Sequence, residues 1–343
     1  MKKHITSLLL ALCLLGSGAT ETFAGPGDTI KVARERGYLI CGVVRNGLGL
    51  AETDDGGDWR GFFPDWCRAF GAAIMGDPDK VRFVELTMKN RLEAVRDGVV
   101  DVLTSNTTHT LGRDQAGLDF PGYYFYDGQG FMVPSGKGWT SLADVEAGKA
   151  CVLANSTTLK NLEDLTATRK PGIEIKVFSS QDGLYSAFFG RQCDIVTNDR
   201  LALASQRVFR AGSTKDFVIL DDTISKEPLG PAVADTDPVF TDAIRWVVRA
   251  LISAEELGVE SVHVLNLREA PPNPAIARLL GVAENVSFPA MLDKDWAFRA
   301  IRAVGHYGEL FGRHFGPQSP IGLARGQNDL WFRGGQLYSP PMR

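Results

Sequence analysis

Two stretches that lie far apart in the sequence share one pattern, and this repeat constrains the fold more than any other feature. They are RLEAVRDGVVDVLTSN (91–106) and LYSAFFGRQCDIVTND (184–199). In each, a helical segment ends at a glycine, an aspartate opens an apolar run typical of a strand, and a polar residue follows the run. A strand, a helix and a further strand in this order predict a parallel sheet. Because the unit occurs twice, we expect two α/β lobes of similar plan.

The segments next to each repeat support this prediction. Apolar β-like runs occupy residues 38–44 and 81–86 before the first repeat, and residues 150–153 and 173–178 before the second. The length of 343 residues also suits two lobes, because single hydrophobic cores stop growing at about 250–300 residues.

The N-terminus has the pattern of a secretory signal. Two lysines precede an apolar run over residues 5–15, and small and polar residues follow up to Ala24. This arrangement is typical of a cleavable signal peptide, and the run is too short to span a bilayer. We expect residues 1–24 to be removed, with Ala19 as a second cleavage position, and the mature protein to be exported.

Four cysteines remain after that cleavage, and an even number in an oxidising compartment permits two disulfides. No pair has the C-x-x-C spacing of a redox or zinc site, and three connectivities are open. The order of the cysteines favours one bond in each half of the chain, Cys41–Cys67 and Cys151–Cys193. Four buried free thiols are the alternative.

Charge and motif content argue against several classes of partner. The net charge of −4 offers no basic excess to neutralise a nucleic-acid backbone. The five histidines form no i, i+4 pair and have no cysteine partner, and no G-x-S-x-G, Walker or complete G-x-G-x-x-G motif is present. We therefore expect no metal, no cofactor and no nucleic-acid partner.

Three loops are candidates for a binding site, because ligands of open α/β sheets bind beyond the carboxyl ends of the strands. Loop 106–114 offers hydroxyl groups and the guanidinium of Arg113, whose planar fork can bind a carboxylate. Ser156 and Thr157 precede a helical segment, where hydroxyl and amide groups can hold an anion. Asp199, in the third loop, can hold an ammonium group.

Each loop also has a purely structural interpretation. Arg113 can be solvated on a surface turn, Ser156 can simply cap a helix, and Asp199 can be the N-cap of a helix over 200–206. Taken together, the loops supply groups for a carboxylate and a countercharge for an amine on opposed lobes. This combination predicts a receptor for a zwitterion.

At this point the sequence resembles a known family, the periplasmic solute-binding proteins of amino-acid ABC importers. It is most similar to the general L-amino-acid-binding subunits that have a long C-terminal extension. The match covers nearly all of the mature chain, and the order and spacing of its segments are more specific than any one motif. The segments are 41–70, 101–114, 119–133, 151–162, 193–199, and a tail from 273–281 through 307–311 to 337–343.

The resemblance implies a two-lobed α/β fold of the type II periplasmic-binding-protein class, in which each lobe is a mixed, mostly parallel sheet flanked by helices. We expect a discontinuous lobe 1 over 28–133 plus 232–262, lobe 2 over 134–231, and a C-terminal extension over 263–343 that packs on lobe 1. Such a protein captures an L-amino acid between its lobes in the periplasm and delivers it to an inner-membrane ABC permease. We expect a monomer.

The resemblance also implies roles for the loop residues. Arg113 and Thr108 would bind the α-carboxylate of the ligand, and Ser156-Thr157 would add amide and hydroxyl contacts to the same group. The backbone of Asn106 and the carboxylate of Asp199 would bind the α-ammonium group.

The side-chain end of the pocket departs from the family pattern. Trp59 and Phe62 are candidate wall residues, although an aromatic residue at such a position is more often part of the core. Phe63 stands where the family usually has an acidic residue, Asn155 replaces a glycine, and residues 48–51 include no aromatic. These differences leave the preferred ligand side chain open.

An enzymatic function is the competing hypothesis. The same scaffold resembles periplasmic cyclohexadienyl dehydratases, which remove water and carbon dioxide from an acid held by an arginine. Asp199 favours binding, because an amine needs a countercharge whereas an acid without an amine does not. We expect no catalysis.

Overall fold

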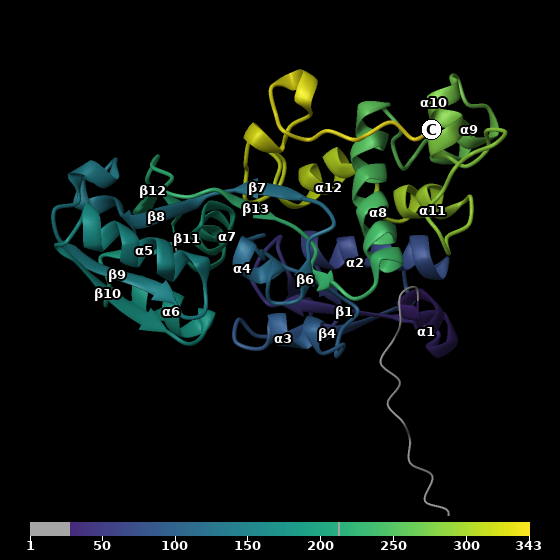
Figure 1. The fold of residues 1–343 in the computed structure, drawn as a ribbon. Coiled ribbons are helices and arrows are strands. Elements are labelled where there is room, and N and C mark those ends of the chain that lie inside the picture. Colours follow the sequence, from purple (N-terminus) through teal and green to yellow (C-terminus); the bar gives the residue numbers. More distant parts are fainter. Residues whose placement is uncertain (1–27, 212) are drawn as a thin grey trace, which may run out of the picture.

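The computed structural model describes residues 28–211 and 213–343, so the expected signal peptide lies outside the described residues. In this part of the chain two principal β-sheets, each flanked by helices, lie in separate halves of the molecule (Figure 1). The prediction of two α/β units is therefore confirmed. Among the described residues, no helix combines the length and apolar character needed to cross a membrane.

The first sheet has the strand order β4-β1-β5. Strand β1 (Leu39–Val44) runs parallel to both β4 (Val81–Leu86) and β5 (Val102–Thr104). Helix α2 (Phe62–Met75) covers one face and α3 (Arg91–Arg96) the other, because alternate residues of β1 enter two different hydrophobic clusters. The helix and strand predicted from the first repeat are thus both present.

Glycine residues fix where α2 begins and ends. Gly61 precedes the helix with a φ of 122°, and a Cβ at this position would lie 2.4 Å from the carbonyl oxygen of Leu50. Gly76 follows the helix in the left-handed region, with a φ of 81°. The helix thus runs from Phe62 to Met75 between these two glycines.

The second sheet has the order β10-β9-β11-β8-β12. Strands β10 and β11 are parallel to β9, whereas β8 pairs antiparallel with β11 and β12. The sheet is therefore mixed. Its strands are parallel from β10 through β9 to β11, and antiparallel from β11 through β8 to β12. The strands are β8 (Gln129–Pro134), β9 (Gly148–Leu153), β10 (Ile173–Phe178), β11 (Ile195–Asp199) and β12 (Phe217–Ile219).

Helices cover both faces of the second sheet. Helix α5 (Thr157–Thr168) packs on the face that includes Phe131, whereas α6 (Gln181–Phe189) and α7 (Arg200–Arg210) pack on the face that includes Met132. The predicted boundary between lobes, at residues 133 and 134, falls inside β8, which belongs wholly to this sheet.

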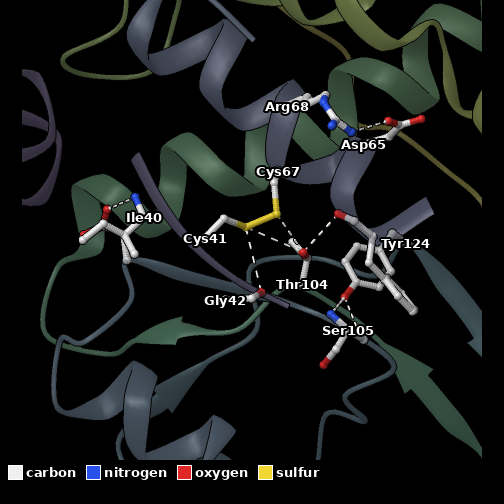
Figure 2. The surroundings of a disulfide bond; sticks show 11 residues. Ile40, Cys41, Gly42, Asp65, Cys67, Arg68, Thr104, Ser105 and Tyr124 are labelled. Carbon is white, nitrogen blue, oxygen red and sulfur yellow. Dashed lines mark hydrogen bonds and ion pairs between the residues drawn. A yellow bond between two sulfur atoms is a disulfide. The ribbon is translucent and has the colours of Figure 1, made fainter. Parts of the chain in front are cut away.

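Both disulfides pair as the order of the cysteines predicted. Cys41 on β1 is joined to Cys67 on α2, which ties the helix to its sheet (Figure 2). Cys151 on β9 is joined to Cys193, which lies just before β11. The alternative of four free thiols is therefore wrong.

Two antiparallel strands connect the halves of the molecule. They are β7 (Phe125–Asp127) and β13 (Glu227–Leu229), and Glu227 stands opposite Asp127 in their register. Figure 1 shows both strands on the side of the molecule where the C-terminal segment passes. The side-chain amide of Asn328 in that segment accepts from the backbone N–H of Tyr126 on β7 (2.6 Å) and donates to its carbonyl oxygen (3.0 Å).

The C-terminal helices build a further layer on the first half. Helix α11 packs against α2 and α8, and Arg299 on α11 donates to the carbonyl oxygen of Ala72 on α2 (3.0 Å). The α-helices here are α8 (Pro238–Glu256), α9 (Val264–Glu269), α10 (Pro274–Leu279), α11 (Trp296–Val304) and α12 (Tyr307–His314). The remaining α-helices and strands are α1 (Asp28–Arg36), β2 (Glu52–Thr53), β3 (Trp59–Arg60), α4 (Leu111–Asp114), β6 (Leu118–Asp119) and β14 (Val233–Ala234).

Candidate ligand-binding site

Loops from the two sheets meet between the halves of the molecule. The side-chain amide of Asn106, which follows β5, donates to Oδ2 of Asp199 at the end of β11 (2.6 Å). The oxygen of the same amide accepts from Nδ2 of Asn46, which follows β1 (2.6 Å). All three side chains are buried. Two of the three predicted loops are therefore in direct contact.

Asp199 faces this junction because another residue caps the helix that follows it. Its side chain makes no capping hydrogen bond to α7. Instead, the N–H of Leu201 donates to Oδ2 of Asp127 (3.0 Å). Asp199 therefore occupies the N-cap position of α7, as the alternative interpretation expected, but its side chain does not cap the helix. Its carboxylate, 4% exposed, accepts from Asn106 instead.

Arg113 is buried rather than solvated, with 9% of the residue exposed. It lies on the short helix α4, and its Nη1 donates to the carbonyl oxygen of Thr108. Burial lowers the pKa of Arg113, whereas the nearby carboxylates of Glu227 and Asp199 raise it. A cation from one half of the molecule and an anion from the other thus lie within electrostatic reach.

The loop that contains Ser156 and Thr157 combines a cap with a contact to a connecting strand. The hydroxyl of Ser156 accepts from the N–H of Leu159 (3.1 Å) and donates to the carbonyl oxygen of Leu153 (2.6 Å), so it caps α5. Thr157, the first residue of α5, donates through its hydroxyl to Glu227 (3.3 Å). The amide groups of the first turn of α5 have no acceptor within the helix, which suits an anion.

Glu227 is a site residue that the sequence reasoning missed. It is 2% exposed and accepts hydrogen bonds from Thr108 and Thr157, which belong to opposite halves of the molecule. Its position at the start of the mostly apolar segment EPLGPAVA (227–234) was the available signal, because a charged residue in a buried strand needs partners.

Arg91 was also missed. It begins α3, is 2% exposed, and its Nε and Nη1 atoms have no hydrogen-bond partner within residues 28–211 and 213–343. Burial, together with the nearby Arg113, lowers the pKa of Arg91 to about 9, and Asp199 partly offsets this change. The guanidinium remains charged at neutral pH. A buried charge without a partner is costly, so Arg91 is a candidate to bind an anionic group.

The carboxylates around the junction affect one another. Burial and the neighbouring Asp127 and Glu227 raise the pKa of Asp199 well above its ordinary value. Burial raises the pKa of Asp127 to about 6. Arg200 acts in the opposite direction on Asp127 and lowers its pKa. Three carboxylates and three guanidinium groups, those of Arg91, Arg113 and Arg200, therefore lie within electrostatic reach around the junction.

The two predicted aromatic wall residues lie in different surroundings. Phe62 is fully buried in the core, with its ring centroid 4.9 Å from that of Phe315. Trp59 packs against Phe83, with the guanidinium of Arg45 4.9 Å from its ring centroid. The structure groups Phe62 with the core and does not bring it to the polar junction.

A cavity of about 490 Å³ lies between the halves, beside this junction. It is lined by Asn46 and Arg45 from one half and by Gln181 and Arg210 from the other. The side-chain amide of Gln181 donates to Oδ1 of Asn46 across the gap. The described part of the chain contains no group of three or more His, Cys, Asp or Glu residues suited to a metal ion.

Comparison with known proteins agrees with this geometry. The chain is 37% identical to the general L-amino acid-binding periplasmic protein AapJ of Rhizobium johnstonii, and 39% identical to the glutamate/glutamine/aspartate/asparagine-binding protein BztA of Rhodobacter capsulatus. Both alignments cover the whole of each chain. Both relatives are named as binding proteins, which favours binding over the dehydratase hypothesis.

A solved structure extends the likeness to three dimensions. A periplasmic binding protein from Brucella ovis with glutathione bound is 40% identical, with a TM-score of 0.89 over 92% of this chain and 99% of that chain. The model of the bacterial extracellular solute-binding proteins, family 3, matches residues 39–317. The predicted α/β fold of the periplasmic-binding-protein class is confirmed, and the chain belongs to the family 3 bacterial extracellular solute-binding proteins.

Proposed function

We propose that this protein captures an L-amino acid between its two halves and delivers it to an inner-membrane ABC permease. One observation carries the proposal: Arg113 and Asp199, held by different halves, are both buried and lie within electrostatic reach of each other. A zwitterion brings one negative and one positive group to such a pair, and the buried setting strengthens both interactions. The names of AapJ and BztA support the same class of ligand.

The roles of the loop residues follow from their chemistry. The Arg113 guanidinium binds the α-carboxylate, with help from the N-terminal amides of α5 at Ser156-Thr157. The Asp199 carboxylate and the backbone carbonyl of Asn106 bind the α-ammonium group.

Arg91 directs the choice of ligand side chain. Its guanidinium is charged, buried and without a hydrogen-bond partner for Nε and Nη1 among the described residues. A side-chain carboxylate of glutamate or aspartate would satisfy both atoms with the planar, two-bond geometry that arginine favours. We therefore propose acidic amino acids as the preferred ligands, which agrees with the name of BztA.

A larger ligand is the second candidate. The Brucella ovis relative holds glutathione, whose γ-glutamyl end carries the same α-amino and α-carboxylate groups. The cavity of about 490 Å³ lies beside Asn46, so the remainder of such a ligand would extend toward the cleft entrance. There it would meet the guanidinium groups of Arg45 and Arg210.

The connections between the two halves define the domain boundaries. We propose that the chain crosses between two lobes at β7 and β13, which places the start of lobe 2 at Gln129 rather than at residue 134. The residues from 263 onward form the extension on lobe 1, with α11 packed on α2. We also propose that the signal over residues 1–24 directs export, that the mature protein is periplasmic and that it is a monomer. AapJ is named as a periplasmic protein.

A binding panel tests this proposal. The full chain is heated with each L-amino acid, with glutathione and with a cyclohexadienyl acid, and the unfolding midpoint is followed by fluorescence. A ligand at one hundred times its Kd stabilises the folded state by about 2.7 kcal/mol, which corresponds to a rise of about 3–5 °C. L-glutamate or L-aspartate should give the largest rise.

Variants then identify the site. Arg113→Gln should remove the response to every amino acid while the circular dichroism spectrum stays unchanged. Arg96→Gln, an exposed arginine on α3, is the matched control and should respond like the wild type. A rise with the cyclohexadienyl acid and with no amino acid would favour the enzymatic hypothesis instead.

A further inference from the structure

A second cavity, of about 800 Å³, lies beside the connecting strands β7 and β13, where the C-terminal segment passes them (Figure 1). A volume of this size suits a small organic molecule. Arg113 and Asp199 are not among the described residues that line it, so the cavity lies outside the proposed amino-acid pair. One half of the molecule contributes Leu323 and Gln327 of the C-terminal segment, and the other contributes Arg207 on α7. The cavity is therefore built by both halves.

Arg207 is a half-buried cation of this cavity. Its Nε atom is buried and has no hydrogen-bond partner among residues 28–211 and 213–343. Burial lowers the pKa of Arg207, and within the described chain no acidic group acts against this change. The other two arginines of the lining are already engaged, Arg325 with Glu255 (3.0 Å) and Arg200 with the carbonyl oxygen of Leu220 (2.6 Å). A guanidinium without an acceptor favours an anion from outside the chain.

The two carboxylates that line the cavity already have donors. Asp127 accepts from the N–H groups of Gly128 (2.8 Å) and Leu201 (3.0 Å). Glu227 accepts from four side-chain donors, two on each oxygen. The exposed Lys226 adds a further positive charge to the lining. The lining therefore favours a negatively charged ligand.

The rest of the lining favours an apolar body on that ligand. Four apolar or aromatic residues of the cavity are half-buried, namely Tyr126, Ile219, Pro228 and Leu323. Such side chains gain free energy when a ligand removes their remaining apolar surface from water. An organic anion that covers them therefore fits this cavity better than a small inorganic anion does.

An occupant of this cavity would connect the two halves. Helix α7 contacts the first half close to Arg207, because the hydroxyl of Ser205 donates to the carbonyl oxygen of Leu48 (2.7 Å). The C-terminal segment is fixed to the first half by the ion pair between Arg325 and Glu255. A ligand held between α7 and this segment thus bridges the halves in the arrangement in which they touch. If it binds this arrangement more tightly than one with the halves apart, it strengthens amino-acid binding by linkage.

We propose that this cavity is a second binding site, that it takes a small organic anion with an apolar body, and that Arg207 binds the anionic group. The bound anion bridges α7 and the C-terminal segment, and thereby strengthens the capture of the amino acid. The site itself is independent of the proposed function, whereas the coupling rests on it.

The test uses hydrocinnamate, a carboxylate on an aromatic body, and its neutral analogue hydrocinnamyl alcohol. Binding of each probe to the full chain is measured by ligand-detected NMR titration. Arg207→Gln removes the proposed anchor, and Arg113→Gln removes the guanidinium of the amino-acid site, which could itself hold a carboxylate. Arg169→Gln is the matched control, because Arg169 is an exposed arginine of the same half as Arg207 and lies outside the cavity. Circular dichroism checks the folding of each variant.

We expect hydrocinnamate to bind the wild type with a Kd of about 1 mM or lower, which is ordinary for a ligand of this size. Replacing the acid by the alcohol, or Arg207 by glutamine, should weaken binding about tenfold or more, the usual effect of losing a hydrogen bond between charged groups. Arg113→Gln and Arg169→Gln should change the Kd of hydrocinnamate by less than about threefold.

The coupling is measured with the amino acid that stabilises the protein most in the binding panel. At saturation, this amino acid should lower the Kd of hydrocinnamate about fivefold or more, the lower end of usual allosteric coupling. Hydrocinnamate should lower the Kd of the amino acid by the same factor, because such coupling is reciprocal.

Other outcomes overturn the inference. Absence of binding up to about 10 mM, or equal binding of the acid and the alcohol, would mean that the cavity is no anion site. Loss of binding in Arg113→Gln but not in Arg207→Gln would place the carboxylate in the amino-acid site. Binding through Arg207 that does not respond to the amino acid would refute the bridging of the halves.

Two further controls keep the test decisive. Should Arg207→Gln fail to fold, Lys226→Glu replaces it, because this exposed residue also lines the cavity. Reversal of its charge should weaken the binding of hydrocinnamate about threefold or more and leave the alcohol unaffected, and an equal effect on both probes would refute the anion site. A protein that binds hydrocinnamate through Arg207 but binds no amino acid refutes the proposed function and leaves this site standing.

Discussion

Replacing Arg91 by methionine should stabilise the unliganded protein and weaken the binding of acidic amino acids. The pKa of this buried guanidinium falls from 12.5 to about 9. At 1.36 kcal/mol per pKa unit, the folded state disfavours the charged form by about 5 kcal/mol. Methionine removes the charge and keeps much of the apolar stem. Allowing for lost packing, we expect the free energy of unfolding to rise by about 1–4 kcal/mol.

The effect on binding should have the opposite sign. If Arg91 meets the side-chain carboxylate of L-glutamate, its loss leaves that carboxylate buried without a partner, which costs about 3–5 kcal/mol. This corresponds to a Kd about 10²- to 4 × 10³-fold higher. L-glutamine, whose side chain carries no charge, should lose far less, so the preference of the protein for glutamate over glutamine should fall.

Two measurements on the same variant check this reasoning. Urea unfolding without ligand gives the change in stability, and titration calorimetry gives both affinities. The control variant is Arg96→Met. Arg96 lies on α3 like Arg91, but it is exposed and pairs with Asp97, so this change should alter the free energy of unfolding by less than about 0.5 kcal/mol. A destabilised Arg91→Met protein with unchanged glutamate affinity would refute the argument, because it would mean that the guanidinium serves the fold.

Three further predictions follow from the charges and the disulfides. Asp199 has a raised pKa in the folded protein, so its ionised form, which binds ammonium, becomes populated only above its ordinary range near pH 4. Affinity should therefore rise with pH through that window and binding should release protons, seen as a buffer-dependent enthalpy in calorimetry. Burial alone would raise the pKa of Asp65, but His314, Arg313 and Arg68 lower it. The stability that these contacts contribute should thus be present at neutral pH and lost as pH falls below about 4, and Asp65→Asn should be less stable by about 1–3 kcal/mol at pH 7 but not at pH 3 in urea unfolding. Replacing both cysteines of a pair by serine should lower the free energy of unfolding by about 3.5 kcal/mol for Cys41–Cys67 and about 4 kcal/mol for Cys151–Cys193, because the loops they close differ in length.

The fold was predictable because its repeated unit has a local physical cause. Asp101 and Asp194, the aspartates that precede the two repeated strands, accept hydrogen bonds from the backbone N–H groups of Ile40 (2.7 Å) and Lys149 (2.9 Å). Each of these amides belongs to a strand that runs parallel to the repeated one. The carboxylate thus connects the start of one strand to the neighbouring strand. This role requires an aspartate just before the strand, and that aspartate is visible in both repeats of the sequence.

Part of the site was predictable for a similar reason. The residues after β5 and β11 lie at the carboxyl ends of parallel strands, so the rule for open sheets predicted that Asn106 and Asp199 would approach the same cleft. Ser156 illustrates the limit of this rule. Its cap of α5 and its place at the cleft have the same local sequence signature, and only the hydrogen bond to Leu153 reveals how its hydroxyl is used.

Arg91 left no local signal, and the signal for Glu227 was only its place at the start of an apolar segment, because the burial of both residues depends on distant segments. Glu227 meets Thr108 across 119 residues of sequence and Thr157 across 70. Arg91 begins a short helix, where a charged residue is most often solvated. Local patterns predict which element a residue belongs to, but the exposure of its side chain is decided by the chain that later covers it.

The buried charge of Arg91, which the sequence reasoning missed, is the one that our proposal connects with ligand choice. A charge that serves only the fold is normally paired when buried, because an unpaired one is costly. Arg91 departs from that rule among the described residues, so its retention is understandable if a partner arrives from outside the chain. Glu227 is fully paired, and two of its partners are hydroxyls from opposite halves of the molecule. For Arg91 we propose that a ligand supplies the hydrogen-bond partners that are missing among the described residues, and local sequence patterns do not record such a contact.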